Sequence, residues 1–302
     1  MPPAQPSLLI ITGATASGKT DFALAWARAH NAEIVSCDSL LVYRGMDIGT
    51  AKPGANVRAA VAHHCLDLVE PDDVFSVAEY VRAASGAIRD IAARGRKIVV
   101  CGGSGFYLQA FYRAVAGSTP VPAAVEAQVR ALAAEGLPAL VEALLPFAPE
   151  KPAFLDWQNP RRVAKALERC LAGRRPLAEL YAEFLSARGP FDAFPKRTLL
   201  LERAPAELEA RIKQRTQAML RAGLVDEVRT LRDTGKLRPG TPASSSIGYR
   251  ETLAWLETER GGLTALAEAI TIATRQLAAK QRKWFRTQIP VDETLHPPQL
   301  WD

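Results

Sequence analysis

Long apolar segments are absent from this 302-residue sequence, although 48% of its residues are hydrophobic. No run approaches the roughly 18 apolar residues that a membrane-spanning helix requires. Residues 1–7 have neither the basic nor the apolar region of a signal peptide. We therefore expect a cytoplasmic protein without a membrane partner. The hydrophobic content is sufficient for one large domain or two smaller domains, each with a core.

Cysteine and histidine are also scarce. The four cysteines form no Cys-x-x-Cys pair, which favours reduced, buried thiols over a disulfide framework or a zinc site. Basic residues outnumber acidic ones, which gives a net charge of +6 and an isoelectric point of about 9.2. This excess fits a polyanionic partner such as a nucleic acid, and it fits simple surface solubility equally well.

The sequence does contain a phosphate-binding loop of the pattern G-x-x-x-x-G-K-[S/T]. Its residues are Gly13, Ala14, Thr15, Ala16, Ser17, Gly18, Lys19 and Thr20. An apolar run over residues 8–12 precedes the loop and a helix-like segment over residues 21–30 follows it, as the motif requires. Backbone N–H groups and the positive end of the helix would bind an anion. Lys19 would contact terminal phosphate oxygens, and Thr20 would ligate Mg²⁺.

A second chemical feature follows the next predicted strand, residues 33–37, which ends at Asp38 and Ser39. Ligands of open α/β sheets bind at the carboxyl ends of the strands, so Asp38 would lie beside the phosphate loop. Its carboxylate could hold Mg²⁺ or accept a proton from a nucleophile. The alternative is a structural role, because Asp and Ser often cap turns.

Strands and helices alternate along the first third of the chain. A capping box formed by Ser76 and Glu79 opens a predicted helix over residues 76–94. Further predicted elements are a helix at residues 104–114 and strands at residues 65–69, 97–101 and 196–202. Continuous apolar strands between helices predict an α/β fold whose parallel sheet is covered by helices on both faces.

The remainder of the chain is predicted to be mainly helical. Residues 123–189 show no strand signal, so we interpret residues 116–189 as a helical insertion into a core formed by residues 1–115 and 190–302. Residues 206–286 continue as helix, and the Pro-rich tail after Ile289 is expected to be irregular. The expected fold class is a P-loop-type α/β core with an all-helical insertion domain.

Residues 38–53 carry a resemblance to a known family. They fit the pattern D-S-x-x-x-Y-x-G-M-D-I-G-T-A-K-P, and with the loop they resemble the tRNA dimethylallyltransferases, also called tRNA isopentenyltransferases. Ala14 replaces the usual proline of the loop, which leaves the phosphate contacts intact. Glu126 stands where relatives carry a basic residue. Further segments of the family pattern lie at residues 102–108, 159–168, 246–251 and 274–286.

The resemblance implies transfer of a dimethylallyl group from dimethylallyl diphosphate to N6 of adenosine 37, in tRNAs that read codons beginning with U. The products are N6-isopentenyladenosine and diphosphate, and Mg²⁺ is required. The loop would then hold the diphosphate leaving group, and Asp38 would be the base. Arg211 and Arg215 share one face of a predicted helix; the family implies that one of them reaches the diphosphate, and we favour Arg215. We expect a monomer.

The resemblance and the basic charge together imply contacts with the anticodon stem-loop of tRNA. Tyr249 could stack on the loop and Arg250 could add charge, whereas Trp284 and Phe285 could also be core residues. The predicted tRNA contacts are Asp38, Ser39, Leu40, Leu41, Ser104, Glu126, Arg161, Arg162, Val163, Ala164, Lys165, Ser245, Ser246, Ile247, Gly248, Tyr249, Arg250, Lys280, Gln281, Arg282, Lys283, Trp284, Phe285 and Arg286. Ser104 could alternatively be a helix N-cap.

Two other classes of protein carry the same loop. An ATP-dependent kinase or ATPase usually has an acidic residue at the end of a second apolar strand, but residues 98–101 are followed by two glycines. A non-catalytic RNA-binding protein could retain the loop by descent. The intact Lys19, Thr20 and Asp38 argue against that alternative.

The basic run near the end of the last predicted helix generates a prediction. Replacing Lys280, Arg282 and Lys283 by neutral residues is expected to weaken tRNA binding and to flatten its dependence on salt. With fewer phosphates contacted, tRNA binding releases fewer counterions. Binding titrations at several salt concentrations measure this slope. An unchanged slope would mean that this helix does not follow the phosphate backbone.

Overall fold

The computed structural model describes residues 6–115 and 121–296. The chain divides into two compact units, one formed by Met1–Tyr112 with Pro190–Asp302 and the other by Arg113–Gly189. Residues 116–120, where the sequence predicts the start of the insertion, lie outside the described residues, as do the terminal residues 1–5 and 297–302. None of the helices in the described part has the length and apolar character needed to cross a membrane.

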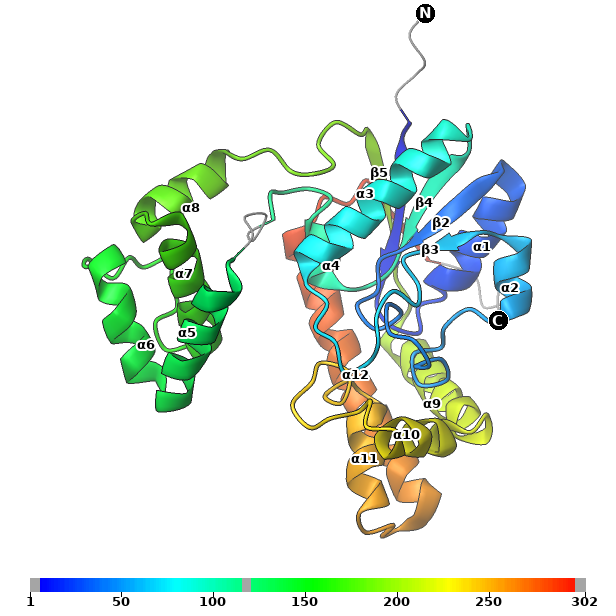
Figure 1. Cartoon of the computed structure of the whole chain (residues 1–302). Helices are drawn as coiled ribbons and strands as arrows, with labels where there is room; N and C mark the ends of the chain where they lie inside the picture. Colours follow the sequence, from blue (N-terminus) through cyan, green and yellow to red (C-terminus); the bar gives the residue numbers. More distant parts are fainter. Residues whose placement is uncertain (1–5, 116–120, 297–302) are drawn as a thin grey trace, which may run out of the picture. The chain divides into compact units, whose positions relative to one another are not determined.

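The first unit contains a parallel sheet with the strand order β3-β2-β4-β1-β5-β6 (Figure 1). Its strands are β1 (Leu8–Gly13), β2 (Ala32–Ser36), β3 (His63–His64), β4 (Lys97–Cys101), β5 (Lys196–Leu201) and β6 (Glu293–Leu295). The central strand β1 is buried along its whole length, because helices cover both faces of the sheet. The predicted α/β fold with a covered parallel sheet is therefore confirmed.

Helices of this unit are α1 (Lys19–His30), α2 (Ala55–Ala60), α3 (Val77–Ala93), α4 (Gly105–Gln109), α9 (Pro205–Arg221), α10 (Leu224–Asp233), α11 (Tyr249–Leu256) and α12 (Gly262–Gln288). Successive side chains of β1 enter two cores. Leu9 and Ile11 pack with α1, whereas Leu8 and Ile10 belong to the larger core that includes residues of α3 and α12. Figure 1 shows α9, α10 and α11 beyond the carboxyl ends of the strands.

Local sequence signals explain where several elements begin. Ser76 Oγ accepts from Glu79 N at 3.2 Å, and Ser76 N donates to Glu79 Oε2 at 2.6 Å, so the predicted capping box of α3 is confirmed. All four cysteines are buried, as predicted. Asn31, in the left-handed region with φ 54°, ends α1.

The second unit is helical and has a core of its own. It contains α5 (Ala123–Glu135), α6 (Leu137–Leu144), the short 3₁₀ helix η1 (Leu145–Phe147), α7 (Pro160–Gly173) and α8 (Leu177–Ser186). Its buried centre includes Val129, Leu140, Val163 and Leu167. The side chain of Asn159 accepts from two backbone N–H groups at the start of α7.

Three predictions of local structure are wrong. The strand expected at residues 65–69 does not form, because Cys65 and Asp67 adopt left-handed conformations with φ 61° and 53°, and β3 lies just before them. The helix expected at residues 104–114 is limited to α4. The tail contains β6, which pairs with β5; Asp292 Oδ2 accepts from Thr198 N at 2.7 Å beside this pairing.

An ion-pair cluster at the β2–β3 side of the sheet makes stability dependent on pH. Burial alone would raise the pKa of Glu33, but hydrogen bonds from Arg94 and His64, both 2.7 Å from Oε2, lower it below its ordinary value of 4.5. The ionised carboxylate of Glu33 therefore stabilises the folded state at pH values above its ordinary pKa of 4.5. This contribution is lost as the pH falls through the lower pKa of the folded state.

We expect Glu33→Gln to lower the free energy of unfolding by about 1 kcal/mol at neutral pH, a modest amount because Arg94 is half exposed. Urea unfolding of the wild type and the variant, measured from neutral pH down to about pH 3, should show the difference shrinking toward acid. A difference that is equal at every pH would contradict this assignment.

Candidate active site

The phosphate-binding loop joins β1 to α1 at the carboxyl edge of the sheet. Gly18 is the N-cap of α1 and lies in the left-handed region with φ 89°, where a Cβ would be 3.2 Å from Arg203 Nη2. No side chain caps the first turn of α1, so its N–H groups remain available to an anion. Ser17 Oγ is buried and has no hydrogen-bond partner among the described residues. This loop therefore fits a phosphate or diphosphate group.

Lys19 lies at the centre of this loop. Its Nζ donates to Ala14 O at 3.3 Å. Burial lowers the pKa of Lys19, and the neighbouring Asp38 opposes that effect. Thr20, the next residue, is exposed in the first turn of α1. The described residues contain no cluster of three or more acidic, histidine or cysteine side chains that could hold a metal alone, so a divalent ion would depend on Thr20 and on the oxygens of a bound anion.

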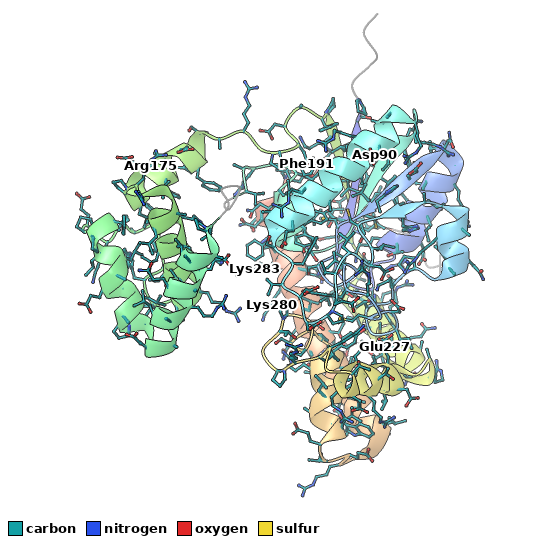
Figure 2. The ribbon with its side chains drawn as sticks, in the orientation of Figure 1. Asp90, Arg175, Phe191, Glu227, Lys280 and Lys283 are labelled. Atoms are coloured by element: carbon teal, nitrogen blue, oxygen red, sulfur yellow. The ribbon has the colours of Figure 1, made fainter. Side chains whose placement is uncertain are left out.

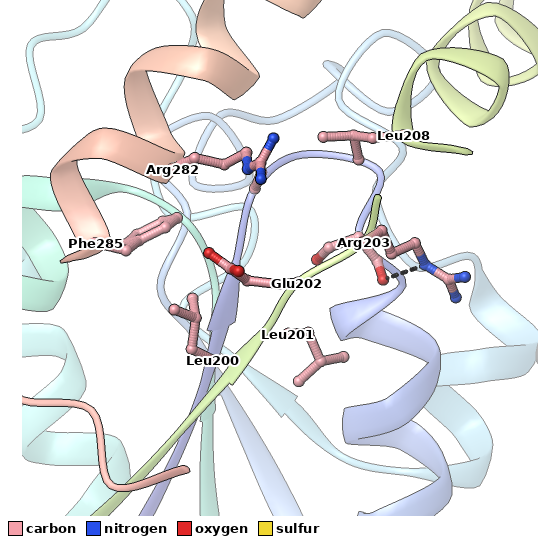
Figure 3. A pocket seen from close by; sticks show the side chains of 9 residues that line it. Leu200, Leu201, Glu202, Arg203, Leu208, Arg282 and Phe285 are labelled. Carbon is pink, nitrogen blue, oxygen red and sulfur yellow. Dashed lines mark hydrogen bonds between the residues drawn. The ribbon is translucent and has the colours of Figure 1, made fainter. Parts of the chain in front are cut away.

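Arginines brace the loop from the side of β5 and α9. Arg203 Nε donates to Ser17 O at 2.9 Å, and Arg211 Nε donates to Ala16 O at 2.9 Å. A dashed line marks the bond from Arg203 in Figure 3. Sequence reasoning missed Arg203, although it follows the carboxyl end of a strand beside β1, the same signal that pointed to Asp38. Burial and the charge of Arg203 lower the pKa of Arg211.

Arg215 connects the loop to the segment of residues 43–53. Its Nη1 lies 3.5 Å from Thr15 Oγ1, and its Nη2 donates to Thr50 O at 3.4 Å. Burial lowers the pKa of Arg215, and the carboxylate of Asp38 opposes that shift. The structure thus brings both arginines of the predicted pair to the loop, with Arg215 on the side that interacts with Asp38.

Asp38 follows β2, and its backbone continues that strand because Cys37 N donates to Cys101 O at 2.8 Å. Asp38 Oδ1 accepts from Leu40 N at 3.0 Å, so the carboxylate does cap a turn. No hydrogen-bond donor of the described chain occupies Oδ2. One oxygen therefore serves the structure, while the other remains free for chemistry.

Ser104 lies opposite Asp38 at the end of β4. Its Oγ accepts from Ser39 N at 2.8 Å and donates to Ser39 Oγ at 3.1 Å. Ser104 occupies the N-cap position of α4, but its side chain makes no capping hydrogen bond there. Ser104 is therefore the N-cap residue of α4, as the alternative expected, but its hydroxyl ties the β4–α4 turn to the residue beside Asp38 instead of capping the helix.

Gln281 on α12 is placed inside the site. Its Oε1 accepts from Thr15 N at 2.8 Å, and its Nε2 donates to Gly103 O at 3.0 Å. Both ends of the amide join the phosphate loop to the β4–α4 turn, and the tRNA contact expected at the partly exposed Gln281 stays a prediction. Sequence reasoning could not assign the joining role, because the partners lie far away in the chain.

Several predicted tRNA contacts are corrected by burial. Tyr249 is fully buried and its hydroxyl donates to Glu227 Oε1 at 2.6 Å, so its ring is not available to stack on an RNA base. Val163 belongs to the core of the helical unit, and Phe285 is 1% exposed in the core of the other. Ser246 and Gly248 are buried as well.

The remaining predicted contacts are at least partly accessible. On α12, Lys280 and Lys283 are exposed (Figure 2). Arg286 pairs with Glu202, and Arg282 lines a cavity of about 10 Å³ behind the loop, large enough for about one water (Figure 3). Other exposed or partly exposed members are Ser39, Leu40, Leu41, Ser104, Glu126, Arg161, Arg162, Ala164, Lys165, Ser245, Ile247, Arg250 and Trp284.

The sequence is similar to a protein family and to named proteins of other organisms. The model of a family described as IPP transferase matches residues 41–288. A protein of Opitutus terrae named tRNA dimethylallyltransferase is 52% identical, over 95% of this chain and 92% of its own length. One of the same name from Methylibium petroleiphilum is 43% identical, over 92% of this chain and 86% of its own length.

Solved structures are similar as well. A full-length tRNA isopentenylpyrophosphate transferase of Bacillus halodurans matches with a TM-score of 0.66 and 30% identity, over 96% of this chain and 91% of its own. A eukaryotic dimethylallyltransferase described as acting on tRNA matches with a TM-score of 0.79 over 96% of this chain and 74% of its own. At 24% identity, that match supports the fold alone.

The bridge made by Gln281 generates a prediction. Gln281→Glu keeps an acceptor for Thr15 N, but it removes the donor to Gly103 O and adds negative charge beside an anion site. We expect it to weaken binding of inorganic diphosphate by roughly 10- to 100-fold, measured by calorimetry. Gln276→Glu, on an exposed position of the same helix, is the control and should change binding little. Equal effects of the two variants would show that overall charge, not the bridge, matters.

Proposed function

The chain belongs to the IPP transferase family, and from this premise we propose that it transfers a dimethylallyl group from dimethylallyl diphosphate to N6 of adenosine 37 in tRNA. The substrates are tRNAs that read codons beginning with U, and the products are N6-isopentenyladenosine and diphosphate. The enzyme acts as a monomer in the cytoplasm and uses Mg²⁺.

The observation that supports this proposal is the meeting of an anion site with a carboxylate at one edge of the sheet. Lys19 and Arg215 both interact electrostatically with Asp38, and one oxygen of Asp38 is committed to a turn. Prenyl transfer to an amine requires two groups: a site that stabilises the negative charge of the departing diphosphate, and an acceptor for the proton of the amine.

The loop lowers the barrier to departure of the diphosphate. As the allylic C–O bond breaks, negative charge develops on the diphosphate oxygens. Backbone N–H groups of the loop, the ammonium of Lys19 and the guanidinium of Arg215 stabilise that charge where it develops. Thr20 would hold Mg²⁺, which neutralises part of the same charge when it is bound.

Asp38 completes the reaction at the acceptor. The N6 amine is conjugated with the purine ring and is a poor nucleophile, so the new N–C bond forms as a proton passes from N6 to the carboxylate. The adenine must leave its stack to reach this edge. Ser104 and Ser39, joined through their hydroxyls, would hold the nucleotide beside Asp38.

RNA would be recognised mainly through its phosphate backbone, by exposed cations on each of the two units. Lys280 and Lys283 on α12, and Arg161, Arg162 and Lys165 on α7, are exposed cations suited to phosphate contacts. Phe106, two residues beyond Ser104, is 74% exposed. An exposed aromatic ring at this position offers a surface on which an unstacked base can pack.

An ATP-dependent kinase or ATPase is less well supported. β4, the neighbour of β1, is followed by Gly102 and Gly103, where such enzymes usually carry a metal-binding acid. Glu202 follows the other neighbour, β5, but its carboxylate pairs with Arg286. An assay with labelled dimethylallyl diphosphate or ATP, and unmodified tRNA, separates the classes. Label in the tRNA is expected; ATP consumption without transfer would refute the proposal.

Variants of Asp38 separate its two possible roles. Asp38→Ala is expected to abolish turnover while tRNA binding stays within a few fold. Asp38→Asn keeps Oδ1 for Leu40 N but cannot accept the proton, so it should also lose roughly 100-fold or more in kcat. If Asp38→Asn retained nearly full activity while Asp38→Ala did not, the carboxylate would be a turn cap and not the base.

A further inference from the structure

Glu227 on α10, labelled in Figure 2, accepts three hydrogen bonds from the segment of residues 43–53. Oε2 accepts from Asp47 N at 3.0 Å and from Ile48 N at 2.7 Å, and Oε1 accepts from Gly49 N at 3.1 Å. Three successive backbone N–H groups that converge in this way form an anion-binding nest. Here a side chain of the protein fills the nest.

Tyr249 supports the same carboxylate from α11. Its hydroxyl donates to Glu227 Oε1 at 2.6 Å. Burial and the adjacent carboxylate raise the pKa of Tyr249 well above its ordinary value, so this hydroxyl stays a donor at physiological pH. The ring also lies directly on the segment, because a Cβ at Gly49 would be 2.5 Å from Tyr249 Cε2.

Lys52 fixes the other end of the segment. Its side chain is fully buried, and Nζ donates to Tyr43 O at 2.6 Å and pairs with Asp47 and Asp67, each at 2.7 Å. The segment therefore has little freedom between its two anchors. The backbone carbonyl of Thr50, which accepts from Arg215, lies between them.

We propose that Glu227 is a positioning residue that acts on the reaction through Arg215. The carboxylate orders residues 47–49, this order sets the direction of the Thr50 carbonyl, and that carbonyl aims the guanidinium of Arg215 across the phosphate loop. Glu227 itself touches neither diphosphate nor RNA. The inference rests on the proposed prenyl transfer, because it assigns Arg215 a part in stabilising the leaving group.

The isosteric change Glu227→Gln tests this role. The amide retains one acceptor oxygen, but its NH₂ group would face backbone N–H groups, so the nest cannot close. We expect kcat at saturating substrates to fall by about 10- to 100-fold, with the affinity for tRNA unchanged within a few fold. The control is Asp226→Asn, the same chemical change on the neighbouring residue, which is 79% exposed and pairs with Arg229. The control should match the wild type.

A double-mutant cycle distinguishes positioning from a general loss of structure. In an Arg215→Lys background, Glu227→Gln should lower kcat by less than about threefold, because residues that act in series are not additive. If Glu227→Gln lowered kcat by the same factor in the Arg215→Lys background as in the wild type, the two residues would act independently and the proposal would be overturned. Tyr249→Phe keeps the ring on Gly49 and removes one hydrogen bond, so it should show the same pattern with a smaller loss.

Calorimetric binding of inorganic diphosphate provides a readout that does not depend on prenyl transfer. Glu227→Gln should weaken it by about 10-fold, whereas Asp226→Asn should not. If the wild type transferred no prenyl group, the proposed function would fail, while this measurement would still decide the role of Glu227. Unchanged diphosphate affinity and unchanged kcat in Glu227→Gln would overturn the inference.

Discussion

The concentration of positive charge around one short loop is the constraint on which the rest of the site depends. Lys19, Arg203, Arg211 and Arg215 all reach the loop, and they repel one another at partly buried positions. Backbone carbonyls of the loop accept hydrogen bonds from several of them, and Asp38 offsets the charge of Lys19 and Arg215. Such a preformed array stabilises a polyanion without reorganising as charge develops.

Hydrogen bonds from other polar side chains hold this array and the segments around it. Gln281 joins the loop to the β4–α4 turn, Ser104 joins that turn to Ser39, and Glu227 orders the segment that accepts from Arg215. Each of these side chains makes at least two hydrogen bonds. Side chains whose rotamers are fixed in this way hold a site to the accuracy that chemistry requires.

Prediction from the sequence succeeded where the signal was local. The loop between β1 and α1, the cap of α3 and the covered parallel sheet followed from residue order and periodicity. β6 and the bracing role of Gln281 were not predicted, because both depend on pairing with distant segments. Tyr249 was predicted to stack on RNA because its side chain is aromatic. Its ring is instead packed against Gly49 and buried, which the sequence alone did not indicate. No contact in the structure tests the role of Asp38 as the base, so that role stays a prediction.

The bridge from Gln281 to Thr15 spans 266 positions of the chain. A protein made from its amino terminus exposes the phosphate loop early in synthesis, but this brace arrives only when nearly the whole of α12 has emerged from the ribosome. Incomplete chains therefore carry an unbraced loop, and a chain truncated before α12 loses the loop's support together with its basic surface. Competence of the site is in this way tied to synthesis of the chain through α12.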